Sequence, residues 1–221
     1  MQLSTNYIKK IQKYIENPII GLSLYVFIFI YNLYGLIILE NKKNKPTKIH
    51  PTARVHPSAC ISLYGVQIGK NVIIGKKAVI KFDTHIQPGV IINDNCVIGD
   101  TGYQIYQYKT KRLQVIHTGG VIISENAVIG SNTCIDRGLF GKFTYIGSRS
   151  KIGEHANIGH NIHIGSDSTI EDNVTIGGNT FTGERVYIGN NSVISNRLKI
   201  SSNSVVKQGT IVTRDILENV A

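Results

Sequence analysis

The chain has 221 residues and a formal net charge of +10, a length that suits one domain or one domain with an appendage. Its three cysteines lack any CxxC spacing, so they suggest neither a disulfide framework nor a zinc site and favour a reducing compartment. The positive charge fits an anionic membrane surface or an anionic small molecule better than nucleic acid, because no nucleic-acid motif occurs.

Residues 1–48 carry no repeat and are interpreted as a separate N-terminal segment. Residues 5–16 are expected to form a short polar helix. Residues 19–39 are almost wholly apolar, about the length that a bilayer-spanning helix needs, and lysines flank them on both sides. The run is long and lacks a small-residue cleavage pattern, which argues against a signal peptide. Both membrane association and packing against the protein or between its subunits are left open.

From residue 49 onward an apolar branched residue recurs at every sixth position in four runs, which cover residues 49–61, 68–98, 123–135 and 146–212. In the second half of the chain these positions are Ile146, Ile152, Ile158, Ile164, Ile170, Ile176, Thr182, Ile188, Ile194, Ile200, Val206 and Val212. A period of six fits neither a helix nor a two-residue strand alternation. It is typical of a hexapeptide β-helix, in which three short strands and three corners make one coil. Residues about eighteen apart should therefore stack, in about eight coils.

The repeat covers residues 49–214, with glycines after many inward residues, where a backbone turn or a close approach suits them. Residues 100–120 contain no hexad and are expected to leave the coil as a functional loop. Ile146 follows Ile135 by eleven positions instead of twelve, which predicts one irregular corner. Residues 215–221 are a short tail. The predicted fold class is all-β, a parallel β-helix with an N-terminal apolar helix.

The phrase IGEHANIGHNIHIG places His155, His160 and His163 on outward or corner positions. An exposed imidazole is usually a polar surface residue, and we interpret His155 and His163 in that way. His160 differs because Gly178 stacks above it one coil later, and Asn196 two coils later. A neutral imidazole can accept a proton from an attacking amine, and a bare glycine amide can donate to an oxyanion.

The neighbouring column adds polar groups to the same groove. Asn161 is expected to stack beneath Asn179, with Arg197 on the next coil. Together with the imidazole and the glycine amide, these groups provide parts that an acyl transfer needs. No serine or cysteine is paired with a base in a recognisable motif, so direct transfer is more economical than a covalent enzyme intermediate.

The stretch GGVIISENAVIGSNTCIDRG, followed after the irregular corner by IGSRSKIGEHANIGHNIHIG, resembles the core of the UDP-3-O-acylglucosamine N-acyltransferases of lipid A synthesis. GDTGY at residues 99–103 also resembles that family. The resemblance implies a left-handed β-helix, a homotrimer with active sites between subunits, and transfer of a 3-hydroxyacyl chain from acyl carrier protein to a sugar amine. It also implies His160 as general base and Gly178 as oxyanion donor.

The sequence departs from that family in four places, one of which is the loop between Ile135 and Ile146, which is one residue longer than the family pattern. Only 48 residues precede the coil where the family has a uridine-binding domain, and nine follow Val212 where it has a helical extension. Arg197 stands where the family has a second histidine. The catalytic chemistry therefore carries over better than UDP recognition or a long acyl chain.

We expect an N-acyltransferase that acts on the amine of an amino sugar linked to a nucleotide or a lipid. The donor substrate is an acyl carrier protein or coenzyme A thioester, with no permanently bound cofactor. Asn161, Asn179 and Arg197 should line the groove, and Tyr103 should stack on a base or sugar. An acetyl-CoA-dependent acetyltransferase of nucleotide sugars or polysaccharide keeps the same parts. A non-catalytic or metal-binding β-helix scaffold is the alternative of another class.

The expected location is the cytoplasm, at the inner face of the cytoplasmic membrane. There residues 19–39 would keep the coil near cytosolic thioester donors. The expected assembly is a homotrimer, and nucleic acid is not an expected partner.

Overall fold

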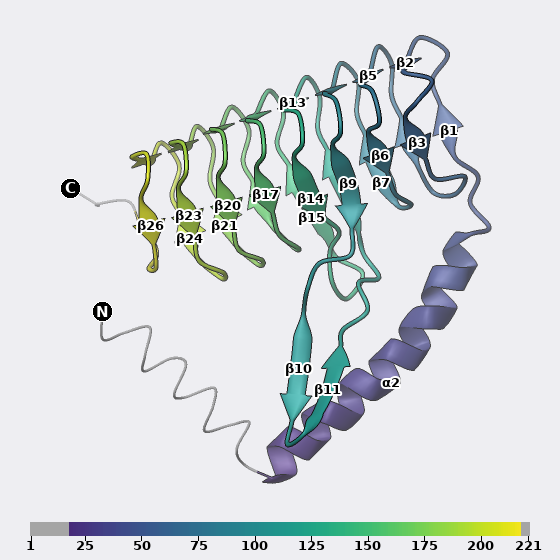
Figure 1. The fold of residues 1–221 in the computed structure, drawn as a ribbon, viewed down its shortest axis with the longest axis vertical. Helices are drawn as coiled ribbons and strands as arrows, with labels where there is room; N and C mark the ends of the chain where they lie inside the picture. The colour runs from purple at the N-terminus through teal and green to yellow at the C-terminus, as the bar shows by residue number, and fades with distance from the viewer. Residues whose placement is uncertain (1–17, 218–221) are drawn as a thin grey trace.

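The computed structural model describes residues 18–217 and shows a rod of stacked coils with a helix along one side (Figure 1). Three parallel sheets of eight strands each form the rod, so the prediction of about eight three-strand coils is confirmed. Where the repeat is unbroken, strands of consecutive coils pair at an offset of eighteen residues, as Asn157 does with Thr175 and Thr175 with Val193. The fold is the parallel β-helix that the six-residue period predicted.

Most strands are only two residues long, and each coil contributes one strand to each sheet. The first sheet contains β1 (Lys48–Ile49), β4 (Gln67–Ile68), β7 (Thr84–Ile86), β12 (Gly120–Ile123), β15 (Phe143–Ile146), β18 (His163–Ile164), β21 (Phe181–Thr182) and β24 (Lys199–Ile200). The second contains β2 (Arg54–Val55), β5 (Ile73–Ile74), β8 (Ile91–Ile92), β13 (Val128–Ile129), β16 (Lys151–Ile152), β19 (Thr169–Ile170), β22 (Tyr187–Ile188) and β25 (Val205–Val206). The third contains β3 (Cys60–Ile61), β6 (Val79–Ile80), β9 (Val97–Asp100), β14 (Cys134–Asp136), β17 (Asn157–Ile158), β20 (Thr175–Ile176), β23 (Val193–Ile194) and β26 (Ile211–Val212).

The side chains at the sixth-position ladder fill the inside of the coil. Ile158, Ile176 and Ile194 lie one above the other and are each no more than 1% exposed. Thr182 is the polar residue in the ladder and is fully buried. Its hydroxyl accepts a hydrogen bond from the Gly165 N–H at 3.3 Å. The ladder tolerates this threonine because its buried oxygen is satisfied.

Glycine and asparagine have different roles at the corners. A Cβ on Gly147 would lie 2.5 Å from the carbonyl carbon of Gly165 on the next coil, so glycine is required there by close approach. The left-handed backbone conformation falls two residues further on in each hexad, at Asn161 (φ 54°), Asn179 (φ 60°) and Arg197 (φ 64°). For the repeat glycines from Gly147 to Gly189, close approach is the reason that holds, because other residues make the turn, whereas Gly99 after Ile98 itself adopts φ 82°.

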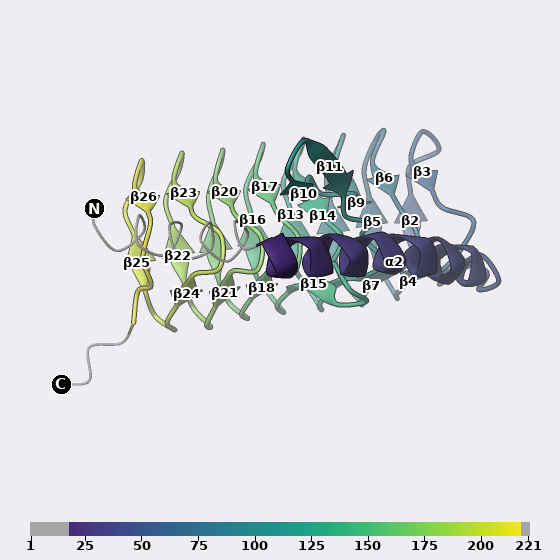
Figure 2. The ribbon, with the colours of Figure 1, turned by 90° about the horizontal axis from the view of Figure 1, so that it is seen from below.

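Residues 100–120 leave the coil as predicted, but they form an antiparallel hairpin of β10 (Ile105–Tyr108) and β11 (Lys111–Gln114). The hairpin lies beside helix α2 (Pro18–Lys42) in two perpendicular views (Figures 1 and 2). Tyr106 donates its hydroxyl hydrogen to the Gly21 carbonyl at 3.0 Å and packs in an apolar cluster with Ile28. The insertion is therefore a platform on which the helix rests.

Helix α2 confirms the predicted apolar helix, and Asn32 within it has a specific partner. Its Nδ2 donates to the Gln114 carbonyl at 2.8 Å, while its Oδ1 accepts from the Ile116 N–H at 2.9 Å. The Asn32 carboxamide thus donates one hydrogen bond to the loop backbone and accepts one from it, as a peptide group of a neighbouring strand would. Tyr31 adds a hydrogen bond from its hydroxyl to the Ile116 carbonyl at 3.0 Å.

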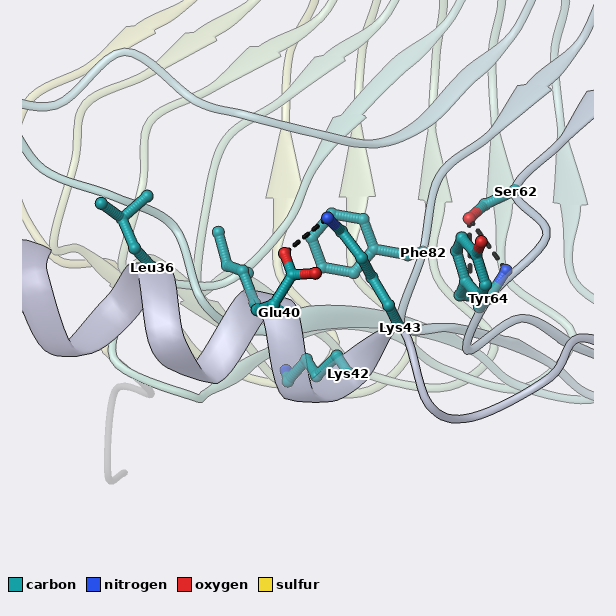
Figure 3. A pocket seen from close by; sticks show the side chains of 8 residues that line it. Leu36, Glu40, Lys42, Lys43, Ser62, Tyr64 and Phe82 are labelled. Carbon is teal, nitrogen blue, oxygen red and sulfur yellow. Dashed lines mark hydrogen bonds and ion pairs between the residues drawn. The ribbon is translucent and has the colours of Figure 1, made fainter.

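The C-terminal end of α2 is held separately, against the coil. Lys42 forms an ion pair with Asp83, which directly precedes β7. A cavity of about 320 Å³ lies between the last turns of α2 and Phe82. Figure 3 shows the side chains that line it, among them the ion pair of Glu40 with Lys43. Both ends of the helix therefore have their own contacts with the rest of the protein.

The opposite face of α2 is apolar and exposed. Five of its large side chains are about half exposed, namely Phe29 (49%), Ile30 (58%), Leu33 (53%), Leu36 (57%) and Ile37 (58%). Within residues 18–217, α2 is the one helix long and apolar enough to cross a membrane, by length and composition alone. The helix thus packs on its own protein and also presents an apolar surface. The helix predicted for residues 5–16 lies outside the described residues.

The irregular corner that the eleven-residue spacing predicted lies at residues 137–142. Arg137 begins it, is 1% exposed, and donates from Nε to the Gly99 carbonyl at 2.8 Å. Phe140 packs its ring 4.5 Å from that of Tyr31 on α2. This corner therefore joins the root of the hairpin, the coil and the helix.

Two buried threonines give a matched test of how the coil satisfies its polar groups. Thr144 and Thr182 are both fully buried, but the Thr144 hydroxyl has no hydrogen-bond partner among the described residues. We expect Thr144→Val to raise the free energy of unfolding by about 1–3 kcal/mol, because it removes an unsatisfied oxygen. Thr182→Val should lower it, because the Gly165 N–H loses its acceptor. Equilibrium urea unfolding measures both, and equal losses in the two variants would contradict this explanation.

Candidate active site

His160 lies at the corner after β17 and is only 8% exposed, more buried than an outward position implies. Gly178, one coil later, lies directly against its ring, since a Cβ on Gly178 would fall 2.6 Å from Cε1 and 2.7 Å from Nε2. Any side chain at position 178 would displace the imidazole. The Gly178 N–H has no hydrogen-bond partner within residues 18–217, so it is free to donate to a ligand.

A directed chain of hydrogen bonds fixes the protonation of the His160 ring. The Leu139 N–H donates to Asn161 Oδ1 at 2.6 Å, so the amide nitrogen of Asn161 must point the other way. Asn161 Nδ2 then donates to Asn179 Oδ1 at 3.0 Å, and Asn179 Nδ2 donates to His160 Nε2 at 3.2 Å. Nε2 is therefore the acceptor and carries the lone pair, which places the ring proton on Nδ1.

The electrostatic surroundings of His160 also favour the neutral ring. Burial lowers the pKa of His160 below its ordinary value of 6.5, and the positive charge of Arg197 lowers it further. A neutral imidazole with a lone pair at Nε2 is the form that a general base requires.

His117 provides a second imidazole at this site, and no pattern in the sequence indicated it. Its ring meets that of His160 edge to face, with centroids 5.2 Å apart and planes at 83°. Its Nδ1 lies 3.1 Å from the Val115 carbonyl, which can only accept, so Nδ1 carries the proton. Nε2 is buried without a hydrogen-bond partner among the described residues. Burial lowers the pKa of His117 to about 4, with a further contribution from His160.

Asp136 faces the same small space as His117. A Cβ on Gly102 would lie 2.7 Å from Asp136 Oδ2 and 3.0 Å from His117 Nε2, so the two polar atoms border the space above that glycine. Burial, and to a lesser extent the nearby Asp100, raises the pKa of Asp136 to about 6. His117 follows the hairpin and Asp136 ends β14, and no periodicity in the sequence connects them.

A cavity of about 610 Å³ opens beside this group of residues. Its polar lining consists of the predicted groove residues Asn161, Asn179 and Arg197 on the coil, together with Gln104 just before the hairpin. Its apolar lining comes from α2, the hairpin and the irregular corner, and includes Ile20, Leu24, Ile28, Ile105, Tyr106, Val115, Leu139 and Phe140. The structure therefore brings the predicted polar residues together and adds an apolar wall that the sequence did not reveal.

Other predicted residues lie apart from this cavity. Tyr103 is 82% exposed and does not line it, so its predicted stacking on a base or sugar stays a prediction. His155 is exposed, and His163 stacks between Tyr145 at 4.8 Å and Phe181 at 4.7 Å. The part of the chain that the structure describes holds no group of three or more His, Cys, Asp or Glu residues placed to bind a metal ion.

Comparisons with known proteins identify the class of the repeat and the fold. Residues 143–178 match the bacterial transferase hexapeptide model, and residues 65–99 and 168–201 match the hexapeptide repeat of succinyl-transferase. A UDP-N-acetylglucosamine acyltransferase from Campylobacter jejuni superposes with a TM-score of 0.64 at 24% identity, over 77% of this chain and 69% of that one. The chain is thus a hexapeptide-repeat protein with the left-handed parallel β-helix fold.

Curated relatives make the similarity more particular. A UDP-3-O-acylglucosamine N-acyltransferase from Methylococcus capsulatus is 43% identical over 60 residues, which is 27% of this chain and 17% of that protein. The enzyme of the same name from Acinetobacter baylyi is 28% identical over 165 residues, 61% of this chain and 42% of that protein. The resemblance to these N-acyltransferases is confirmed, and the chain spans less than half the length of these relatives.

His117 and Asp136 should affect the pH dependence of stability in opposite directions. The pKa of His117 falls on folding from 6.5 to about 4, so its stabilisation is present above pH 6.5 and is lost as the pH falls toward 4. The pKa of Asp136 rises on folding from 3.8 to about 6, so its contribution grows as the pH falls through that window. In the wild-type protein the two contributions oppose each other between about pH 4 and pH 6.

Removing either titratable side chain should therefore leave the pH dependence that the other one contributes. Relative to wild type, His117→Gln should make the slope of unfolding free energy against pH more negative, by up to about 1.4 kcal/mol per pH unit. Asp136→Asn should make it more positive. Urea unfolding across this pH window measures both slopes. Slope changes of the same sign would show that these groups do not titrate as their burial implies.

Proposed function

We propose that this protein is an N-acyltransferase that moves an acyl group from a thioester to the amine of an amino sugar, a precursor of lipid A or of a surface polysaccharide. The observation that carries the proposal is the contact of the neutral His160 ring with Gly178, whose N–H is free, at the polar end of a ligand-sized cavity. Similarity to UDP-3-O-acylglucosamine N-acyltransferases supports the same chemistry.

In this proposal the acceptor amine replaces the Asn179 amide as the group that donates to His160 Nε2. The amine nitrogen attacks the thioester carbonyl carbon while Nε2 takes its proton. The Gly178 N–H donates to the oxygen that becomes negative in the tetrahedral intermediate. The carbon–sulfur bond then breaks, and the imidazolium returns the proton to the leaving thiolate. The products are an amide and a free thiol, and no covalent enzyme intermediate is needed.

The remaining parts of the proposal concern partners. The donor is an acyl carrier protein or coenzyme A thioester and acts as a substrate. Asn161, Asn179 and Arg197 bind the acceptor. The protein acts as a homotrimer in the cytoplasm. The coil exposes apolar residues on its straight faces, such as Val193 (40%), Val205 (68%) and Ile211 (70%), which suits association of copies.

Turnover should depend on His160 in its neutral form. His160→Ala should reduce acyl transfer by about a hundred- to ten-thousandfold, the usual loss on removing a general base. For the wild type, the rate should rise with pH through a value below 6.5 and then level off, because burial and Arg197 lower the pKa of His160. Thiol release and mass spectrometry of the acylated sugar measure the rate with a panel of donors and amino sugars.

The controls keep the local structure of the other two histidines. His155→Asn retains a residue that tolerates the left-handed backbone at φ 54°, and His163→Phe retains the aromatic stack. Both should keep near-normal rates. Equal losses in all three variants would favour a packing or metal-binding role for the histidines and would contradict a general base at position 160.

We further propose that α2 lies in the plane of the inner face of the cytoplasmic membrane. One side of the helix is occupied by the hairpin and the coil, so lipid cannot surround it, while Phe29, Ile30 and Leu33 on the other side are about half exposed. A helix with one apolar exposed side beside flanking lysines suits the bilayer interface.

Vesicle binding tests this location. The double variant Ile30→Glu/Leu33→Glu should bind anionic phospholipid vesicles at least about tenfold more weakly, since each large side chain contributes about 1.5–3 kcal/mol when buried. Leu63→Glu/Leu217→Glu changes two exposed apolar residues outside α2 (75% and 65%) and should bind like wild type. Wild-type protein that remains in the supernatant in this assay would contradict the membrane location of α2.

A further inference from the structure

The cavity beside His160 has two chemically different walls. Ile20, Leu24 and Ile28 are four residues apart on α2 and make one apolar stripe along it. Across the cavity, the coil contributes the carboxamides of Asn161 and Asn179 and the guanidinium of Arg197. A ligand that satisfies both walls must itself have an apolar part and a polar part.

The polar wall also carries a positive charge and no negative one. None of the residues that line the cavity is acidic, and Arg197 is the one charged residue among them. Within residues 18–217 no carboxylate forms an ion pair with Arg197, whereas Lys81, Arg149 and Arg185 on the coil each pair with an acidic side chain. An unpaired guanidinium in this position suits a phosphate, which it can bind through two parallel hydrogen bonds.

The order of the groups along the cavity limits how such a ligand lies. Asn179 lines the cavity and also donates to His160 Nε2. The imidazole therefore lies behind the polar wall when viewed from the cavity. Along the cavity, a ligand therefore meets first the apolar stripe of α2, then Arg197 with the two asparagines, and last the imidazole. A chain joined through phosphate to an amino sugar has its parts in this order. An acyl thioester does not, because its chain begins at the reacting carbonyl and its phosphates lie on the other side of it.

The apolar wall is made by the same helix that exposes an apolar face to the outside. Leu24 lines the cavity and is 38% exposed, whereas Ile30 is 58% exposed and does not line it. If α2 rests at the bilayer, the cavity adjoins the lipid, and an apolar chain can enter it without crossing water.

We propose that the acceptor is a membrane lipid: an amino sugar carried through phosphate on an apolar chain. The chain lies along Ile20, Leu24 and Ile28, the phosphate binds Arg197, and the sugar amine reaches His160. This inference rests on the proposed acyl transfer, of which it specifies the acceptor. It makes α2 part of the substrate site in addition to a contact with the membrane.

Photo-crosslinking tests the binding part without requiring turnover. Full-length protein on phosphatidylcholine vesicles is labelled with a long-chain alkyl phosphate that carries a diazirine near the end of its chain, and labelled residues are mapped by mass spectrometry. We expect labels on Ile20, Leu24, Ile28 and the hairpin, competed by dodecyl phosphate and not by dodecanol or inorganic phosphate alone. Labels confined to Phe29, Ile30 and Leu33 would overturn the proposal, because α2 would then only face the bilayer.

Matched variants separate the two walls. Leu24→Trp fills the cavity and should reduce labelling at least about fivefold, whereas Ile30→Trp makes the same change on the outer face and should not. Arg197→Asn should reduce labelling similarly, since it removes the phosphate partner. Arg185→Asn is its control at another left-handed corner, with φ 54°, and should label like wild type. Equal labelling in all four variants would refute the site.

Kinetics distinguish failure of this inference from failure of the proposed function. Leu24→Trp should raise KM for a lipid-phosphate-linked amino sugar at least about tenfold and leave KM for the acyl donor unchanged. Acylation of a water-soluble nucleotide-linked amino sugar at the same rate in wild type and Leu24→Trp, without cavity labelling, would overturn the inference and leave acyl transfer standing. Cavity labelling without acylation by any donor would support the lipid site and contradict the transferase.

Discussion

The close stacking of one coil on the next is the constraint on which the rest of the structure depends. Backbones approach so closely at Gly147 and Gly165 that a single Cβ would collide with the following coil. Because the offset is eighteen residues, every position becomes part of a column. The column of Gly178 over His160 is therefore a consequence of the same geometry that builds the core, with a bare backbone placed against an imidazole.

The appended elements turn a regular rod into a structure with one distinctive side. The hairpin leaves after β9 and returns at β12, and the irregular corner follows β14 on the same side. Helix α2 rests on both of these breaks in the repeat, through Tyr106 and through Phe140. The cavity exists because the helix is held away from the coil by the hairpin at that place.

Two neutral imidazoles in contact are an unusual feature of a surface groove. His160 is linked through Asn179 and Asn161 to the backbone of Leu139, so the irregular corner sets its tautomer. His117 is held by the Val115 carbonyl at the base of the hairpin. Burial keeps both pKa values below the ordinary value, and therefore the loops that cover the groove also tune its chemistry.

The sequence by itself determined the repeat, the inward ladder, the irregular corner and the columns that contain His160, Gly178, Asn161, Asn179 and Arg197. All of these follow from the six-residue period, because each hexad carries the pattern within its own few residues. It did not reveal His117, Asp136 or the apolar wall of α2. Those residues lie in segments without a period, and only tertiary packing brings them to the groove. His117 precedes His160 by 43 positions in the sequence, and the residues of α2 are farther away still.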